Sequence, residues 1–346
     1  MELPTAESLP SERDALIRLV RGVVLAQGNA FIKELLRSRG VKIGTTKADF
    51  QENMVQAIER GELQRQHVDY WLNEVEGWGN QHVYLLKLSK SIRNDPAWRD
   101  PRRIEKKVLG AGFTKQWNAH ASLEYPPVHT LTGIYFEDGV LRFVWHKGLE
   151  FWLRDKTKDY REEIDADTYE FRASRLRGER AVTRFEIRPF DGLAAIFVQI
   201  AVDDEEHKTV VQDVKSTVDR VWPFDELEPF AVASVIKRLD TRSLAQGEIS
   251  AHSTRLNSAG AYVEFGATSA QSGYQDFTPV REVRRAVRPA SFTGTTGTFR
   301  VPTIDTDGKT RQVRIQLYGE QRRIKLASQM TATEVWSVLH LIRENV

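Results

Sequence analysis

The pattern of apolar and polar positions is helical over the first part of the chain. Between residues 11 and 25, apolar side chains recur every three or four positions, which is typical of a helix that buries one face. Ser11, with Asp14 three residues later, forms an N-terminal capping pattern. The same spacing predicts helices over residues 30–38, 47–60 and 64–76. Gly40 and Gly61 follow two of them, where a left-handed residue commonly ends a helix.

Residues 82–92 fit either a helix or a strand, and we favour a helix. From residue 126 onward the pattern becomes that of strands. Apolar residues 132–136 and 140–145 flank the turn Glu137-Asp138-Gly139, which predicts a β-hairpin. Further strands are predicted over residues 149–153, 169–175, 180–188, 193–202, 261–265, 299–303, 312–318 and 322–327.

Helices interrupt these strands. Two are predicted over residues 203–221 and 224–239, the second with Pro229 in its first turn. The capping box Thr331-Ala332-Thr333-Glu334 opens a last helix that ends near residue 344. Loops rich in Ser, Gly and Thr are predicted over residues 266–275 and 290–298.

This order of elements predicts an α+β protein with two domains. A helical N-terminal domain over residues 1–120 precedes a mainly antiparallel, β-rich domain over residues 121–346, with inserted helices near 203–239 and 331–344. The length of 346 residues fits two domains of roughly 100–200 residues each. The 40% hydrophobic and 28% charged residues are ordinary for globular proteins and exclude a mainly disordered chain.

Cysteine is absent from the sequence, which excludes disulfides, thiolate zinc sites, iron–sulfur clusters and a cysteine nucleophile. Residues 1–10 are polar and acidic, unlike a secretory signal. The most apolar run, residues 193–202, is too short to cross a bilayer. We therefore expect a cytoplasmic protein, or a nucleoid or nuclear one if it associates with DNA, and no membrane partner.

The net charge of +2 hides a segregated distribution. Residues 87–115 hold nine basic and three acidic residues, and residues 281–325 hold eleven and four. Residues 171–201 have a smaller excess of three positive charges, whereas residues 136–170 and 202–228 have excesses of four and six negative charges. A basic cluster interleaved with aromatic residues, here Trp98, Phe113 and Trp117, suits a surface that faces phosphates.

The segment from Ile32 to Ile58 places Leu36 before Arg39-Gly40-Val41, and Lys47 three residues before Phe50. In this pattern it resembles a SAP domain, a small helix–extended–helix module that binds DNA. The resemblance implies that Lys47 and the exposed amides around it hold a phosphate at the start of the second helix. The sequence departs from the family at the expected loop glycine, which is Thr45 here, with Gly44 one position earlier.

Residues 14–92 resemble a second family in three features. These are the order of their helices, a helix start at Lys47 and an ending over Gln81 to Ser89. In these features they are similar to the N-terminal helical domain of centromere protein N. That family joins a helical domain to a β-rich domain and reads a nucleosome. Both resemblances point towards DNA, and they rest on the same residues.

Catalytic patterns are weak in this sequence. Among the eight histidines only His120 and His129 are close in sequence, and no pair has metal-ligand spacing. Asp203-Asp204-Glu205-Glu206 is the densest carboxylate set, which suits either a magnesium ion or the N-terminus of a helix, and we favour the helix. Asp307-Gly308-Lys309 and Glu264 lack the context of a strand-borne nuclease motif. We expect no cofactor and no metal.

We therefore hypothesise a structural or adaptor protein that binds double-stranded DNA through its phosphates, with little sequence specificity and without its own catalysis. The candidate contact residues are Lys33, Arg37, Arg39, Lys42 and Lys47; Arg102, Arg103, Lys106 and Lys107; and Arg284, Arg285 and Arg288. One alternative is a metal-dependent nuclease, for instance in prokaryotic defence, that uses the acidic residues 203–206. The other is a protein–protein adaptor whose acidic segments meet a basic partner or the basic segments of a second copy.

Overall fold

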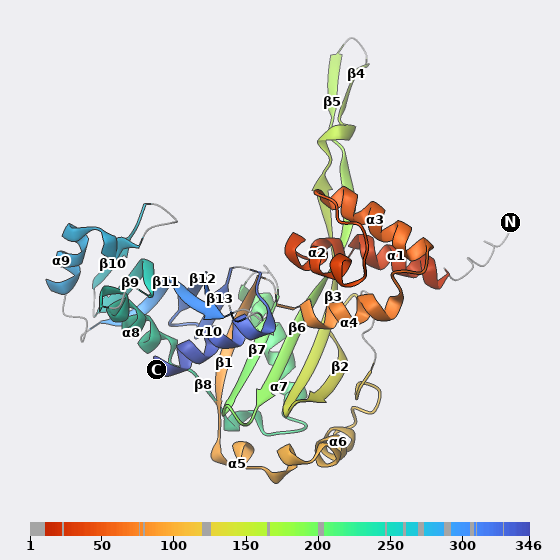
Figure 1. The fold of residues 1–346 in the computed structure, drawn as a ribbon. Coiled ribbons are helices and arrows are strands. Elements are labelled where there is room, and N and C mark those ends of the chain that lie inside the picture. Colours follow the sequence, from red (N-terminus) through yellow and green to blue (C-terminus); the bar gives the residue numbers. More distant parts are fainter. Residues whose placement is uncertain are drawn as a thin grey trace. The chain divides into compact units, whose positions relative to one another are not determined.

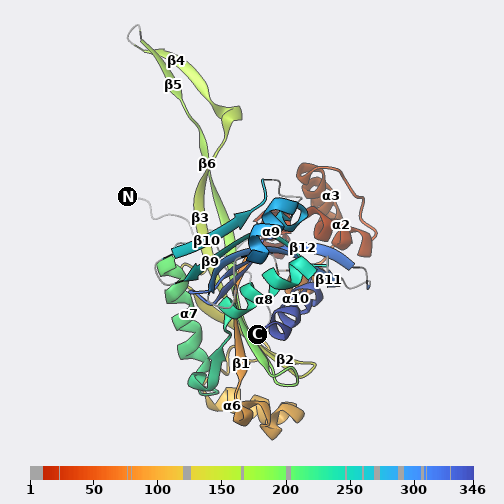
Figure 2. The same ribbon diagram turned by 90° about the vertical axis from the view of Figure 1, so that its left-hand side faces the viewer.

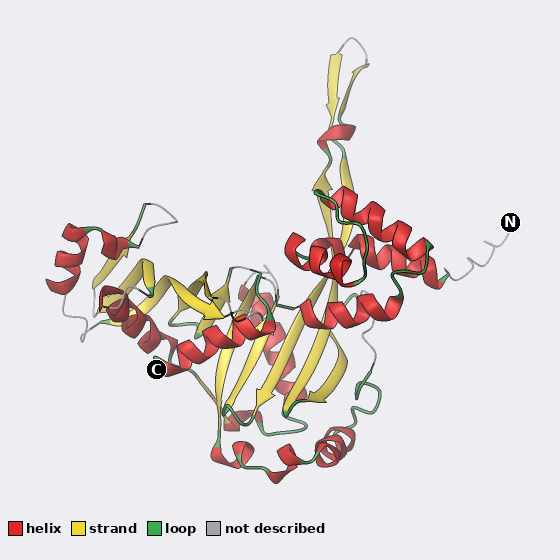
Figure 3. Cartoon of the chain, in the orientation of Figure 1, coloured by secondary structure: helices red, strands yellow, loops and turns green. Residues whose placement is uncertain are grey.

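The computed structural model describes residues 11–22, 24–75, 77–78, 80–119, 126–164, 167–199, 204–245, 248–258, 261–268, 273–286, 292–304, 308, 310–327 and 329–346. The chain forms two compact units (Figure 1). Unit 1 comprises residues 1–73, 121–130 and 146–181, and unit 2 comprises residues 74–120, 131–145 and 182–346. Helices and antiparallel strands occur together, so the fold class is α+β, as predicted (Figure 3).

The helical part of unit 1 follows the sequence prediction closely. Its helices are α1 (Glu12–Gly22), η1 (Val24–Ala26), α2 (Asn29–Ser38), α3 (Lys47–Glu59) and α4 (Arg65–Val75). Ser11 caps α1 by accepting a hydrogen bond from the Asp14 amide at 3.2 Å. Gly40 and Gly61 have φ angles of 65° and 74°, the left-handed conformation that ends α2 and α3. The apolar faces of these helices meet in a core that includes Leu19, Ile32, Leu36, Phe50, Met54 and Val68.

The strand residues of unit 1 form an extended ribbon. β3 (Val140–Arg154) and β6 (Ser174–Arg188) are continuous strands of 15 residues, of which residues 146–154 and 174–181 belong to unit 1. The separate strand predicted at residues 149–153 is the end of β3. Beyond β3 and β6, β4 (Tyr160–Ile164) pairs with β5 (Asp167–Phe171) in a two-stranded sheet (Figure 1). The short helix η3 (Lys156–Lys158) precedes β4. The sequence analysis did not predict β4.

Unit 2 is built on an 11-stranded sheet with the order β10-β9-β11-β12-β13-β1-β7-β6-β3-β2, and β8 pairs with β1. Its other strands are β1 (Gln81–Leu88), β2 (Thr130–Glu137), β7 (Leu193–Val198), β8 (Leu227–Pro229), β9 (Ser250–Ser258), β10 (Ala261–Gly266), β11 (Thr293–Ile304), β12 (Thr310–Tyr318) and β13 (Arg323–Leu326). Its helices are α5 (Lys90–Arg93), η2 (Pro96–Arg99), α6 (Pro101–Gly110), α7 (Asp204–Val218), η4 (Phe224–Glu226), α8 (Val232–Ala245), η5 (Tyr274–Asp276), α9 (Thr278–Ala286) and α10 (Ala332–Glu344).

Around β7 both faces of this sheet are covered (Figures 1 and 2). The six residues of β7 are all buried and alternate between two cores. Leu193, Ala195 and Phe197 face the core beneath α8 and α10. The intervening residues of β7 face a second core, which contains residues of α6 and α7. Burial on both faces explains why β7 is a continuous apolar run without polar alternation.

Several sequence predictions for unit 2 are wrong in detail. Residues 82–92 were expected to be helical, but β1 occupies most of them, since β1 pairs with both β13 and β7. The helix predicted over residues 224–239 begins only at Val232, because residues 227–229 form β8 against β1. Part of the predicted loop 290–298 is the start of β11. The predicted hairpin is confirmed as β2 and β3, and the capping box before α10 is present.

Candidate nucleic-acid interface

Helix α6 separates its apolar and basic side chains around its axis. Ile104 and Val108, four residues apart, are buried in the core of unit 2. Arg102 and Lys106 are also four residues apart and lie on the opposite side of the helix, where both are exposed. The side of α6 that faces solvent is therefore cationic.

The other two predicted cations of α6 are engaged with neighbouring groups. The Lys107 ammonium lies 2.6 Å from an Asp95 carboxylate oxygen and 4.6 Å from the centroid of the Trp222 ring. Arg103 Nε lies 3.5 Å from Asp100 Oδ2. Lys107 also lowers the pKa of Asp95, against the effect of burial, which would raise that pKa. These contacts fix the local fold and leave less positive charge for an external ligand.

Three further cations lie just before α6, and the sequence analysis did not select them. Lys90 and Arg93 belong to α5, Arg99 ends η2, and all three are exposed. Within the described parts of the chain, none of these side chains forms an ion pair or hydrogen bond, and the same holds for Arg102 and Lys106. We call these five residues the α5–α6 basic surface: Lys90, Arg93, Arg99, Arg102 and Lys106.

The acidic residues beside this surface already have hydrogen-bond partners within the protein. Asp95 and Asp100 cap η2 and α6 by accepting backbone hydrogen bonds, in addition to their ion pairs. Glu105 accepts a hydrogen bond from Trp117 Nε1 at 3.1 Å. Glu226 of η4, which contacts the start of this segment, accepts hydrogen bonds from the hydroxyls of Ser89 and Ser91, and these bonds lower its pKa. The excess of positive charge in the sequence therefore becomes an excess at the surface.

The aromatic residues that we expected beside the phosphates are mostly structural. Trp98 is 3% exposed and stacks on Trp222, with ring centroids 4.7 Å apart. Its indole N–H donates to the carbonyl of Ile92 at 2.6 Å. Phe113 is 4% exposed. These rings anchor the helical segment to the sheet and do not offer faces for base stacking.

One aromatic ring is nevertheless available beside the basic surface. Phe190, in the turn between β6 and β7, is 65% exposed. It lines a pocket of about 310 Å³ together with Pro189 and residues of α5 and η2, among them Arg93 and Arg99. Two guanidinium groups and an exposed ring thus line one concave site, together with Asp95, whose carboxylate is paired with Lys107.

The SAP-like segment folds as two helices, but its predicted phosphate-binding residue has internal partners. The Lys47 ammonium donates to the carbonyl oxygens of Leu25 and Gln27, the latter at 2.9 Å. Asp49 accepts hydrogen bonds from the amides of Thr45 and Thr46, and these bonds lower its pKa to about 2. A carboxylate therefore already occupies the N-terminus of α3, where the resemblance implied a phosphate.

The remaining predicted cations are only partly brought together. Lys33 and Arg37 are one turn apart on α2, while Arg39 and Lys42 follow that helix, and all but the half-buried Lys33 are exposed. The third predicted group is divided. Arg284 and Arg285 belong to α9, but their side chains lie outside the described atoms, and Arg288 lies outside the described residues.

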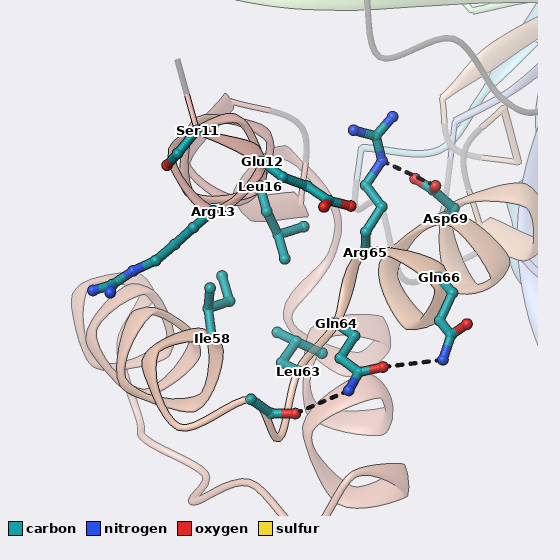
Figure 4. Close-up of a pocket in the computed structure, with 11 residues that line it drawn as sticks. Ser11, Glu12, Arg13, Leu16, Ile58, Leu63, Gln64, Arg65, Gln66 and Asp69 are labelled. Atoms are coloured by element: carbon teal, nitrogen blue, oxygen red, sulfur yellow. Dashed lines mark hydrogen bonds and ion pairs between the residues drawn. The ribbon is translucent and has the colours of Figure 1, made fainter. Parts of the chain in front are cut away.

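A pocket with a volume of about 700 Å³ lies in the helical part of unit 1 (Figure 4). Leu16, Ile58 and Leu63 form its apolar lining. Its rim contains the ion pair between Arg65 and Asp69, with Nε and Oδ2 3.1 Å apart (Figure 4). This pocket gathers none of the predicted DNA-binding residues.

The candidate catalytic residues do not assemble into a site that the structure describes. Helix α7 begins at Asp204, in line with the helical interpretation of the acidic run; Asp203 and the side chains of Asp204 and Glu205 are not described. Asp307 and Lys309 also lie outside the described residues. Within the part of the chain that the structure covers, no three His, Asp or Glu side chains are arranged to hold a metal ion. Nor does any helix there have the length and apolar character to cross a membrane.

Two buried carboxyl groups stand out in unit 2. Asp240 of α8 is fully buried and accepts a hydrogen bond from the Tyr274 hydroxyl. Burial raises the pKa of Asp240 to about 7, although a hydrogen bond from Thr254 opposes the rise. Glu186 of β6 is also fully buried, and Arg142 Nε donates to it at 2.8 Å. Burial alone would raise the pKa of Glu186, but the neighbouring arginines hold it below its usual value.

No protein-family model matches this chain, and no curated protein matches it either. The similarities to the SAP domain and to centromere protein N therefore stay predictions from the sequence.

Proposed function

We propose that the chain binds double-stranded DNA through the α5–α6 basic surface, as a structural or adaptor protein without its own catalysis. The observation behind this proposal is a set of five exposed cations on one helical segment whose neighbouring carboxylates are already bound elsewhere. Lys and Arg side chains in this state neutralise phosphates and release condensed counterions.

This arrangement favours contacts with the phosphate backbone of DNA over contacts with its bases. The segment lies on the sheet through its buried tryptophans, and α6 presents long, flexible cations from its exposed side. Such contacts position a duplex without reading its sequence. Arg93 and Arg99, next to the exposed Phe190, supply a second point of attachment beside α6.

The proposal predicts a specific dependence on salt. Five phosphate contacts give a slope of about −4.5 in a plot of log affinity against log salt, because each contact contributes about −0.9. The affinity for a labelled duplex then falls by about 500-fold between about 50 and 200 mM salt. Fluorescence anisotropy at several salt concentrations measures this slope.

Two charge-reversed variants locate the interface. Arg102→Glu with Lys106→Glu reverses two cations of α6, which should reduce the salt slope by about 2. Lys33→Glu with Arg37→Glu makes the same change of charge at the same spacing on α2, and should leave most of the slope intact. Absence of DNA binding in dilute buffer would contradict the proposed function, and a larger loss in the α2 variant would contradict the proposed site.

A further inference from the structure

The ribbon of β4 and β5 has one apolar face. Their antiparallel register pairs Tyr160 with Phe171, Glu162 with Tyr169, and Ile164 with Asp167. Because side chains alternate along a strand, these three pairs share one face of the ribbon. The rings of Tyr160 and Phe171 stack on that face, with centroids 4.8 Å apart and planes inclined by 12°.

This apolar face is open to solvent. All ten residues of the two strands are exposed, including Tyr160 at 55% and Tyr169 at 46%. Trp152 and Leu176, on the strands that lead into the ribbon, are 70% and 52% exposed. Isolated apolar residues are ordinary at a protein surface, but a cluster on a two-stranded ribbon is not, since such a ribbon is only marginally stable alone. The cluster therefore indicates a docking surface.

The charge of the ribbon limits what can dock there. Residues 160–171 contain one basic and five acidic residues, an excess of four negative charges. Glu162 and Asp167 lie on the apolar face itself. DNA would be repelled by these groups, and so would the same face of another ribbon, because it presents the same two carboxylates. The complementary surface must combine cations with apolar groups.

The chain itself contains a surface of that kind. The α5–α6 basic surface places Arg93 and Arg99 beside the exposed Phe190 in one pocket. Guanidinium groups pair with carboxylates and also stack on aromatic faces such as those of Tyr160 and Phe171. We propose that the acidic ribbon of one copy docks on the α5–α6 basic surface of a second copy. This contact is head-to-tail, since it joins two different surfaces.

Self-association of this kind does not depend on the proposed DNA binding, although both use Arg93 and Arg99. Its strength is measured by sedimentation of the 346-residue chain at low and high salt. The wild-type chain should associate at low salt and dissociate as salt rises. Glu162→Lys with Asp167→Lys reverses the charge on the apolar face of the ribbon, and Arg93→Glu with Arg99→Glu reverses the charge of the pocket. Each double variant alone should weaken association at least about tenfold.

Mixing the two variants gives the decisive result. The charge-reversed ribbon of one variant is then opposite in charge to the charge-reversed pocket of the other. The unchanged ribbon and the unchanged pocket are also opposite in charge, so association should return. Glu163→Lys with Glu170→Lys makes the same charge change on the opposite face of the ribbon and should associate like the wild type. Circular dichroism confirms that each variant is folded.

Three outcomes overturn the proposal: a wild-type chain that stays monomeric at low salt, a ribbon-reversed variant that still associates, or a mixture that does not recover. The DNA proposal is tested separately by the ribbon-reversed variant, because that variant keeps the whole α5–α6 basic surface. It should lose self-association and retain duplex binding.

Discussion

Replacing Asp240 with Asn should stabilise the protein at neutral and alkaline pH. Asp240 is fully buried in α8, and its Oδ1 accepts a hydrogen bond from Tyr274. Asparagine keeps an oxygen in that position and is nearly the same size. It removes only the negative charge, which burial disfavours.

The magnitude follows from the pKa of this carboxyl. Burial raises the pKa from 3.8 to about 7, and one pKa unit corresponds to about 1.36 kcal/mol. Below pH 3.8 the group is neutral in both the folded and the unfolded protein and has no effect. Between that value and about pH 7 the unfolded chain releases its proton first, so the folded protein loses about 4 kcal/mol of stability as the pH rises. Above about pH 7 the loss is complete.

Urea unfolding of the wild type and Asp240→Asn, followed from about pH 5 to about pH 8, tests this reasoning. The stability difference in favour of the variant should grow with pH and level off near its maximum of about 4 kcal/mol. Asp225→Asn removes a carboxylate from an exposed position and should give a small difference at every pH. A difference that is independent of pH, or a variant less stable than wild type at pH 8, would show that Asp240 is not held neutral by burial.

Two further substitutions test contacts at the predicted DNA-binding segments. Lys107→Ala removes an ion pair with Asp95 and a contact with the Trp222 ring, so the free energy of unfolding should fall by about 1–2 kcal/mol. Duplex affinity should fall less than in Arg102→Ala, and the reverse order would mean that Lys107 contacts DNA. In Gly44→Ala the added Cβ would lie 2.1 Å from Asp49 Cβ, so the cap of α3 must shift at a cost of about 1–3 kcal/mol in urea unfolding. Unchanged stability in this variant would contradict the close approach.

The helices of unit 1 were predictable because their signals are local. A capping side chain and a glycine with positive φ act within a few residues, and both are visible in the sequence around α2 and α3. Strand β1 was not predictable, because its partners β7 and β13 are distant in sequence. Both of its faces also meet a core, Val83 and Leu85 on one side and Leu86 on the other. Its residues therefore lack the polar alternation that marks a half-buried strand.

The candidate site was predictable only as an excess of charge. The sequence shows four cations on α6 but not that Lys107 reaches Asp95, twelve residues earlier. It also does not show that Trp98 stacks beneath the surface on Trp222. These tertiary contacts decide which cations remain available to a ligand. In the same way, the register between β4 and β5 decides which side chains share a face of the ribbon, and the sequence does not determine that register.

The position of β1 has a consequence for the order in which the protein is made. Residues 81–88 leave the ribosome more than 200 residues before one of their pairing partners, β13, which ends at Leu326. The basic segment that follows β1 is therefore synthesised long before its supporting sheet is complete. Pairing between residues so far apart also makes folding slow. During synthesis these cations are thus exposed before β13 is available to pair with β1.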